Sequence, residues 1–259
     1  MRQRLLFFLA DLVSAALLAI FFWRFTARML HPLAENRKRQ MQFVASASHE
    51  LRSPLTVILT NTAAVKNGVL PNDAQFLETV ESEGQRMARL ITDMLQLANA
   101  DSQSWSIRPA AAELDTLLLQ VWEAYEPQAA ALRLGWDIQL PDDAVAPYIC
   151  DAERIRQLLG ILIDNAFSYT PAHGHVRLSL TCTGTDFTIA VSDNGPGVPD
   201  AQKESVFERF YRADPARKSK SHFGLGLCIA REIARLHHGQ LLLHDTPGGG
   251  ATFLLRLPK

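Results

Sequence analysis

Residues 76–97, FLETVESEGQRMARLITDMLQL, contain the pattern that decides the first half of the fold. Apolar side chains recur there in alternating steps of four and three residues, which is the heptad spacing of helices that pack along a seam. The spacing therefore predicts a helix that packs against another helix. The seam positions are Phe76, Val80, Glu83, Met87, Leu90, Met94 and Leu97.

The preceding stretch predicts a second helix with a seam of its own. Gly68 and Pro71, in the segment GVLPND, indicate a turn between the two helices. A helical hairpin over residues 32–100 cannot bury both seams alone, so we expect a homodimer in which two hairpins form a four-helix bundle. The second seam consists of Val44, Leu51, Ile58 and Val65, with Leu55 and Thr62 in the adjoining row.

Residues 5–23, LLFFLADLVSAALLAIFFW, form an apolar run of 19 that only Asp11 and Ser14 interrupt. At about 1.5 Å per residue such a helix nearly spans a hydrocarbon layer of ~30 Å, so residues 1–31 are predicted to hold a transmembrane helix and its flanks. A cleaved secretory signal peptide is the alternative, but no small-x-small cleavage site closes the run. Basic residues are more frequent after the run than before it, which places the rest of the chain in the cytoplasm. They are Arg24, Arg28, Arg37, Lys38 and Arg39 after it, and Arg2 and Arg4 before it.

The composition argues against several functional classes. The chain has 259 residues, 47% of them apolar, and a formal net charge of −1, which disfavours both a disordered chain and direct nucleic-acid binding through a general cationic field. Its three cysteines are widely separated and form no CxxC pair, which argues against a disulfide framework or a zinc cluster.

The heptad pattern is lost after Ala100, and residues 101–112 indicate a linker to a second domain over 113–259. Helical and strand patterns mix there, and two adjacent strands are expected to pair antiparallel. The second domain is predicted to be an α/β sandwich, and the whole chain belongs to the α+β class. The predicted helices cover 113–132, 152–167 and a segment from 224, and the predicted strands cover 134–140, 147–150, 176–182, 187–193, 240–245 and 252–257.

Two glycine motifs in the second domain suit a nucleotide. In DNGPGVP, residues 193–199, the Asp193 carboxylate can accept a hydrogen bond from an exocyclic amine such as that of adenine, while Gly195 and Gly197 let the backbone approach a ligand. In GLGL, residues 224–227, a helix begins whose unpaired N–H groups favour phosphate. A plain turn and a glycine-eased helix start are the structural alternatives.

An amide, an aromatic ring and two basic side chains are further candidates for binding a nucleotide. Asn165 and Tyr169, four residues apart, offer an oxygen to a hard cation and a ring near a base. Arg209 and Arg212 begin a basic segment without periodicity that suits either a flap over phosphates or a solvated loop.

His49 lies on the outermost row of the first hairpin helix, beside Glu50, so its ring is expected to face water. Pro54 removes a helical hydrogen bond to the Glu50 carbonyl and should bend or loosen the helix there. With an unperturbed pKa of about 6.5, a neutral imidazole has a lone pair that can attack phosphorus. An exposed histidine by itself is usually a solvated surface residue.

Five motifs, in this order and spacing, resemble the membrane-bound sensor histidine kinases of bacterial two-component systems. They are SASHELRSPLT (46–56), LIDNAFSYTP (162–171), DNGPGVP (193–199), VFERFYRAD (206–214) and FGLGLCIAREI (223–233). The resemblance implies a HisKA-type dimerisation domain and a GHKL-type ATP-binding domain. It also implies an ATP-dependent protein-histidine kinase, single-pass in the bacterial inner membrane, that passes its phosphoryl group to an aspartate of a response regulator.

The resemblance also assigns roles to the candidate residues. His49 would be the phospho-acceptor, Glu50 its base, Asn165 the Mg²⁺ ligand and Asp193 the adenine ligand. Ser53, four residues after the histidine, makes a phosphatase activity a hypothesis. The remaining ATP contacts would come from Tyr169, Gly195, Gly197, Arg209, Arg212, Gly224, Leu225, Gly226 and Leu227, and GGGATF (248–253) would be a turn and pocket wall.

Three positions depart from the usual pattern of these kinases. Ile161 replaces a second asparagine, Ser168 replaces a lysine or arginine, and His222 stands near the place of a lid glycine. They keep an alternative open, a signalling scaffold that binds nucleotide weakly and presents His49 to another kinase. An ATPase or serine kinase of the same nucleotide fold would not account for SHELRSPL or the hairpin seam.

Overall fold

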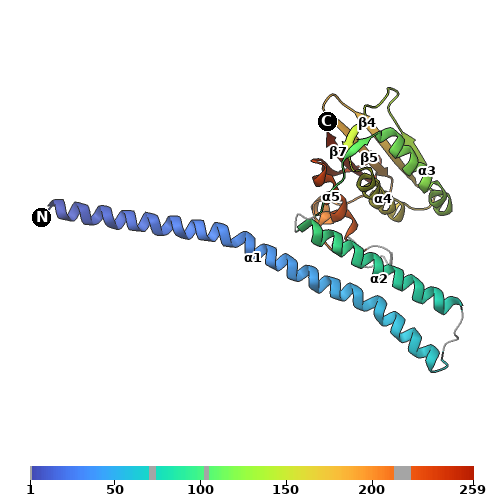
Figure 1. Ribbon diagram of the computed structural model, residues 1–259, viewed down its shortest axis with the longest axis horizontal. Coiled ribbons are helices and arrows are strands. Elements are labelled where there is room, and N and C mark those ends of the chain that lie inside the picture. Colours follow the sequence, from blue (N-terminus) through green and yellow to red (C-terminus); the bar gives the residue numbers. More distant parts are fainter. Residues whose placement is uncertain (1, 70–73, 102–104, 213–222) are drawn as a thin grey trace. The chain divides into compact units, whose positions relative to one another are not determined.

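The computed structural model of the protein describes residues 2–69, 74–101, 105–212 and 223–259 (Figure 1). The chain forms two compact units, Met1–Ser53 and Pro54–Lys259. The first unit consists of the N-terminal part of helix α1, and the second contains the end of that helix and all other elements.

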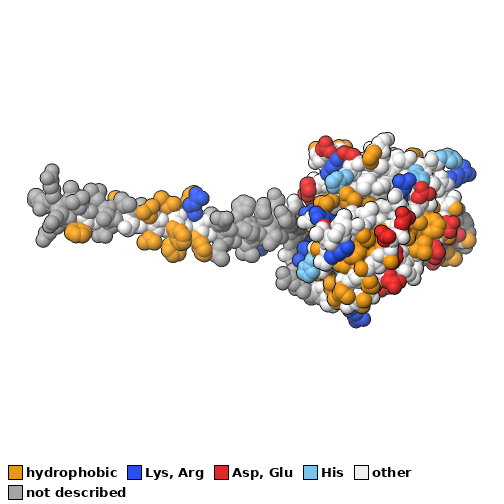
Figure 2. Space-filling model, turned by 90° about the horizontal axis from the view of Figure 1, so that it is seen from above, with side chains coloured by type: hydrophobic (Ala, Val, Ile, Leu, Met, Phe, Trp, Pro, Cys, Tyr) orange, Lys and Arg blue, Asp and Glu red, His pale blue; other side chains and the backbone are white. Residues whose placement is uncertain are grey.

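Helix α1 runs from Arg2 to Lys66 without interruption. It passes through Pro32 and Pro54, so the loosening expected beside His49 does not break the helix. One missing N–H costs a single hydrogen bond, and the bonds on either side keep the backbone helical. Among the described residues, no helix combines the length and apolar character that crossing a membrane requires. Figure 2 nevertheless shows hydrophobic side chains gathered on part of this helix.

Helix α2 spans Ala74–Asp101 and carries the predicted seam. All seven seam side chains are buried or half-buried, and Leu90 and Leu97 are 0% and 2% exposed. Glu83 is tolerated at a buried position because Arg86 lies 3.5 Å from its carboxylate, one turn along the helix. The turn predicted at Gly68 is also confirmed, since this residue has a φ of +71° and its N–H donates to the Val65 carbonyl.

The second half of the chain forms a five-stranded sheet in the order β2-β4-β5-β7-β6, with helices α3, α4 and α5 on one face (Figure 1). Only the β2–β4 pair is parallel. Apolar residues alternate inward along β5 and β7 and meet the helices in the core, as the period of two predicts. The strands are β2 (Gly135–Gln139), β4 (His175–Cys182), β5 (Asp186–Asp193), β6 (Gln240–Asp245) and β7 (Ala251–Pro258), and the helices are α3 (Leu114–Leu132), α4 (Ala152–Tyr169) and α5 (Gly226–Leu236). Two short 3₁₀ turns, Asp200–Gln202 and Ser205–Phe207, lie between β5 and α5.

A small second sheet was not predicted from the sequence. Strand β1 (Ala110–Ala112) pairs antiparallel with β3 (Tyr148–Cys150), so the segment expected to be a linker contains a strand. Three alanines carry neither alternation nor a β-branched side chain, and the pairing depends on backbone hydrogen bonds alone. Trp105, in the same segment, is 8% exposed.

Candidate functional site

Asp193 lies at the end of β5 and is only 5% exposed. Its Oδ1 atom accepts hydrogen bonds from the backbone N–H groups of Gly195, at 2.8 Å, and Ala251, at 3.2 Å. Among the described residues no group donates a hydrogen bond to Oδ2, so this oxygen keeps its full capacity to accept one. Burial raises the pKa of Asp193, and these two N–H groups oppose that rise. The carboxylate is thus held rigidly with one oxygen open, as recognition of an amine requires.

Three segments, two of which contain glycines, meet close to this carboxylate. Gly250 has a φ of +111°, and a Cβ atom there would overlap the Asp193 carbonyl oxygen. A Cβ atom on Gly195 would lie 2.9 Å from the Tyr169 carbonyl oxygen, and one on Gly197 would lie 3.1 Å from that of Gly250. The end of β5, the end of α4 and the turn at 248–250 therefore meet at one point, and the last glycine motif forms a wall of the site.

Asn165 sits on α4, one turn before Tyr169, the last residue of that helix. Its side chain is half-buried and forms no hydrogen bond within the described part of the chain. Hard cations prefer oxygen ligands, and Mg²⁺ is usually held by one or two protein oxygens together with substrate phosphates. Among the described residues, no group of three or more His, Cys, Asp or Glu side chains is arranged to hold a metal ion.

Helix α5 begins at Gly226, two residues later than predicted, and its N-cap residue Leu225 makes no side-chain capping hydrogen bond. The first N–H groups of a helix lack partners within the helix, so they can bind an anion. Gly224, with a φ of +73°, accepts a hydrogen bond from the Phe210 N–H at 2.9 Å. The side chain of Leu225 is 0% exposed and belongs to the core, so the nucleotide contact predicted for this residue would involve its backbone. Leu227 is half-buried.

Ile161, the departure from the usual asparagine, contacts the start of α5. A Cβ atom on Gly226 would lie 3.0 Å from Cγ2 of Ile161, so the aliphatic side chain packs on the glycine backbone. Both residues line a cavity of about 490 Å³ that the sequence did not predict. Its polar lining comes from α2, α3 and α4, through Arg89, Asp93, Gln128, Gln157, Asp164 and Ser168.

Arg209 and Arg212 are half-buried and precede the segment 213–222, which lies outside the described residues together with His222. Arg209 is close enough to Cys228, in the first turn of α5, to favour its thiolate. Burial is the larger effect and raises the pKa of Cys228 to about 12. The position of Arg209 near the helix start agrees with a role at the phosphates.

The acceptor residues lie in the first unit. His49 and Ser53 are exposed on α1, and Glu50 between them is half-buried. The imidazole is therefore accessible, as predicted.

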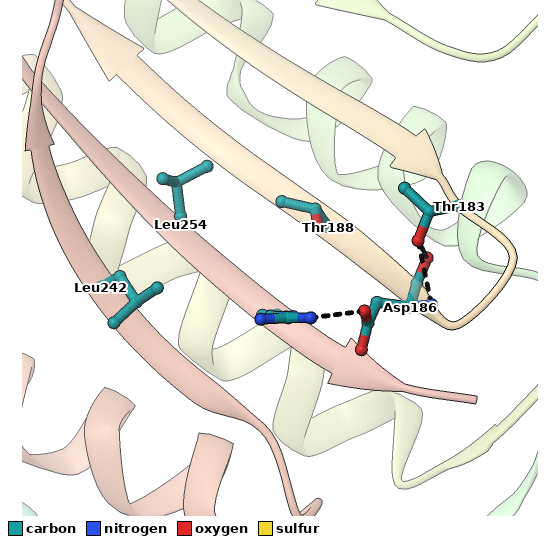
Figure 3. Close-up of a pocket in the computed structure, with 6 residues that line it drawn as sticks. Thr183, Asp186, Thr188, Leu242 and Leu254 are labelled. Atoms are coloured by element: carbon teal, nitrogen blue, oxygen red, sulfur yellow. Dashed lines mark hydrogen bonds and ion pairs between the residues drawn. The ribbon is translucent and has the colours of Figure 1, made fainter.

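A second cavity, of about 300 Å³, lies on the open face of the sheet and shares no residue with the nucleotide motifs (Figure 3). Asp186, at one end of it, accepts a hydrogen bond from Arg256 at 2.7 Å. Short apolar and hydroxyl side chains make up the rest of its lining, so it is separate from the site above.

Known protein families match the part of the chain with the acceptor histidine and the part with the nucleotide motifs separately. Residues 39–103 match the His Kinase A (phospho-acceptor) domain, and residues 150–259 match the histidine kinase-, DNA gyrase B- and HSP90-like ATPase family. The chain belongs to the sensor histidine kinases of two-component systems.

Individual relatives of this family resemble most of the chain. Sensor histidine kinase RppB of Synechocystis sp. is 33% identical over 250 residues, which are 95% of this chain and 55% of RppB. The histidine kinase AdeS of Acinetobacter baumannii has the same fold, with a TM-score of 0.69 and 23% identity over 81% of this chain and 97% of AdeS. The histidine kinase ThkA, solved in complex with response regulator protein TrrA, gives the same TM-score of 0.69 and 23% identity, over 87% of this chain and 65% of ThkA. The chain spans about half the length of the curated relatives it matches.

Proposed function

We propose that the chain is the kinase part of a sensor histidine kinase, which transfers the γ-phosphoryl group of ATP to His49. The observation that carries this proposal is the Asp193 carboxylate, whose Oδ1 is fixed by two backbone N–H groups while Oδ2 has no donor among the described residues. The same domain holds the N-terminus of α5 and the Asn165 amide. The exposed His49 supplies the acceptor. The alternative, a scaffold that binds nucleotide weakly, is ruled out only by an experiment in which bound nucleotide phosphorylates His49.

Each group has a defined task in this reaction. Asp193 Oδ2 accepts from the exocyclic amine of adenine, and the first N–H groups of α5 bind the phosphates. Asn165 would hold Mg²⁺, which when bound would supply positive charge to the phosphates. A neutral ring nitrogen of His49 attacks the γ-phosphorus, the bond to the β,γ-bridging oxygen breaks, and ADP leaves. Glu50 holds the proton on the other ring nitrogen and stabilises the positive ring that forms.

A later transfer to a response regulator is proposed from the family and from the complex of ThkA with TrrA. The phosphoryl group on nitrogen would pass to a regulator aspartate, leaving His49 neutral again. We further propose that Ser53, exposed one turn after the acceptor, orients a water that attacks the aspartyl phosphate of the regulator, so that the bond between phosphorus and the carboxylate oxygen breaks and inorganic phosphate leaves. Loss of label from a phosphorylated regulator, compared between wild type and Ser53→Ala, tests this role, and equal rates contradict it.

Dimerisation is proposed on a second apolar row of α2. Leu77, Ile91 and Leu95 are 59%, 46% and 60% exposed, although they repeat with helical spacing. Gly84 and Ala88 lie between them and would permit close approach of another helix. A second copy of the hairpin would cover this row and complete a four-helix bundle.

Membrane attachment is proposed on the composition of residues 5–23 and on exposed aromatic side chains of α1. Phe21, Phe22 and Trp23 are 63%, 64% and 75% exposed, which is costly in water. The excess of arginine and lysine after them would keep the kinase part in the cytoplasm, at the bacterial inner membrane. Extraction of membrane fractions with carbonate tests this, and a chain recovered wholly in the supernatant contradicts it.

Incubation with γ-labelled ATP and Mg²⁺ tests the kinase itself. Wild type should take up label, while His49→Gln and Asn165→Ala should not, because one lacks the acceptor and the other the metal ligand. Uptake by His49→Gln at the wild-type rate would remove the assigned acceptor. If wild type binds an ATP analogue but takes up no label, the scaffold is the better description.

A further inference from the structure

Asp151 joins two segments through its side chain. It follows β3 directly and is the N-cap of α4, where its Oδ1 atom accepts from the Arg154 N–H at 3.2 Å. Its Oδ2 atom accepts from the backbone N–H of Arg108 at 2.8 Å. Arg108 belongs to the chain that arrives from α2, so one carboxylate caps a helix and also holds this incoming chain.

The backbone of Asp151 makes a third connection, to the end of α5. Its N–H donates to Nε2 of His237 at 3.0 Å. His237 is 4% exposed, and its Nδ1 lies 2.8 Å from the Ile233 carbonyl oxygen. One ring nitrogen accepts and the other donates, so these partners assign a neutral imidazole. The ring thereby ties the last turn of α5 to the first turn of α4.

Residues on both sides of Arg108, within the segment 105–112, also contact the ATP-binding domain. Trp105 is buried, and the Arg154 guanidinium lies 5.1 Å from the centre of its ring. Strand β1 pairs with β3, and Ala110 lies opposite Cys150, the neighbour of Asp151. Residues 105–112 are therefore part of the ATP-binding domain and do not form a free linker.

The charge of Asp151 strengthens these contacts. Burial opposes its ionisation, but the N–H groups of Arg108 and Arg154 and the positive charge of Arg154 outweigh it, and the pKa of Asp151 lies below its usual value. Hydrogen bonds to an ionised acceptor are roughly twice as strong as neutral ones.

These contacts lie at the helix ends opposite the nucleotide groups. Asn165 is near the C-terminal end of α4, and Gly226 starts α5, whereas Asp151 and His237 flank the other ends. A displacement of Arg108 would therefore leave the nucleotide groups in place. It would change how the whole ATP-binding domain is held by the chain that leads to the acceptor hairpin.

We propose that Asp151 is a positioning residue for phosphoryl transfer: it fixes the chain arriving from α2 to both nucleotide-binding helices, so that transfer, but not nucleotide binding, depends on its bond to Arg108. This inference rests on the proposed kinase function. Transfer requires reacting atoms to be aligned within about 1 Å, whereas binding of nucleotide within one domain does not depend on the other.

Two variants test the bond from either side, one by removing its donor and one by leaving a single oxygen for two donors. Arg108→Pro deletes the N–H donor, and Arg108→Ala is its matched control because it keeps the N–H and removes only the side chain. Asp151→Asn keeps an N-cap of equal quality but leaves a single acceptor oxygen. The double variant shows whether both changes act through the same contact.

The full chain is assayed for initial autophosphorylation rate, for affinity for a non-hydrolysable ATP analogue, and for hydrogen exchange of the Arg108 amide. We expect Arg108→Pro and Asp151→Asn each to lower the rate about tenfold with affinity within about twofold of wild type, and the double variant to lose little more. Arg108→Ala should resemble wild type, and the amide should exchange faster in Asp151→Asn.

Unchanged rates in both variants, or rate and affinity falling in parallel, overturn the inference. A wild type that takes up no label contradicts the proposed function instead. In that case hydrogen exchange still decides the contact, because an unprotected Arg108 amide in wild type would contradict it.

Discussion

At the level of single residues, substitution of Asp193 should weaken nucleotide binding. In Asp193→Asn the backbone bonds to Gly195 and Ala251 can persist on the amide oxygen, but an NH₂ group replaces the open oxygen. Hydrogen bonds to charged groups contribute about 1.5–3 kcal/mol, so affinity for an ATP analogue should fall about 10- to 100-fold. Calorimetric titration measures this, with the exposed Asp143→Asn as control. Equal affinities would mean that the carboxylate does not contact the base.

The raised pKa of Asp93 should make the free energy of unfolding depend on pH. Burial raises its pKa from 3.8 to about 6, although Arg89 opposes the rise. The folded chain therefore binds this proton more tightly than the unfolded chain, and the resulting stability is full below about pH 4 and is lost as the pH rises through about 6.

Asp93→Asn should flatten this profile. The side chain is partly solvated, so the gain at pH 8 should be on the order of 1–2 kcal/mol rather than the full value of the shift. Urea unfolding at pH 5 and pH 8 measures the difference, with the exposed Glu78→Gln as control. A variant whose stability changes with pH as wild type does would refute this assignment.

Residue types at the site were predictable because the chemistry restricts them. A carboxylate before glycines and an amide among core residues stand out in DNGPGVP and ILIDNAFSY. The burial of Leu225 was not predictable, since motif position does not show which way a side chain points. The role of Asp93 was missed as well, because it is adjacent to the seam and looks like a solvated helix residue.

At the level of elements, the turn at 248–250 is the most sensitive to substitution. Gly250→Ala would place a Cβ atom against the Asp193 carbonyl at a φ of +111°. The backbone conformation alone costs about 1–2 kcal/mol, and the overlap adds to it. Thermal unfolding should show this loss together with weaker nucleotide binding.

Gly184→Ala is the matched control for this substitution, because its Cβ atom would meet nothing within 4 Å. If Gly250→Ala were as stable as this control and bound nucleotide equally well, the turn could not be the pocket wall described here.

Most elements of the ATP-binding domain follow from periodicity, and their ends agree within about two residues of the predicted ranges. Strand β1 does not, because its alanines pair through the backbone and its partner β3 is far along the chain. The heptad pattern on α2, in contrast, predicted the structure correctly. The side chains of its seam are buried within the unit that contains the helix, so the local spacing in the sequence matches the packing.

At the level of the whole molecule, the exposed row of α2 predicts the oligomeric state. Ile91→Glu would place a charge in the centre of the proposed interface, so the chain should become monomeric. Light scattering after size-exclusion chromatography measures its mass. Leu119→Glu, on the exposed surface of α3, is the control and should stay dimeric. A dimeric Ile91→Glu variant would place the interface elsewhere.

The division into a helical hairpin over 32–100 and an ATP-binding domain over 113–259 stays a prediction that rests on two hydrophobic periods, heptad in the first part and mixed in the second, whereas the compact units of the structure meet between Ser53 and Pro54. The attachment of residues 105–112 to the second part was not predictable, since it depends on a tryptophan, one backbone N–H and one distant carboxylate. Contacts of this kind leave no periodic signal in a sequence.

We propose above all that the nucleotide site formed around Asp193 phosphorylates His49. Peptide mapping of the full chain after incubation with γ-labelled ATP and Mg²⁺ tests it most directly. We predict a single labelled peptide that contains His49, stable in base and hydrolysed in acid. Label on a serine, a threonine or another of the eight histidines would show that His49 is not the acceptor.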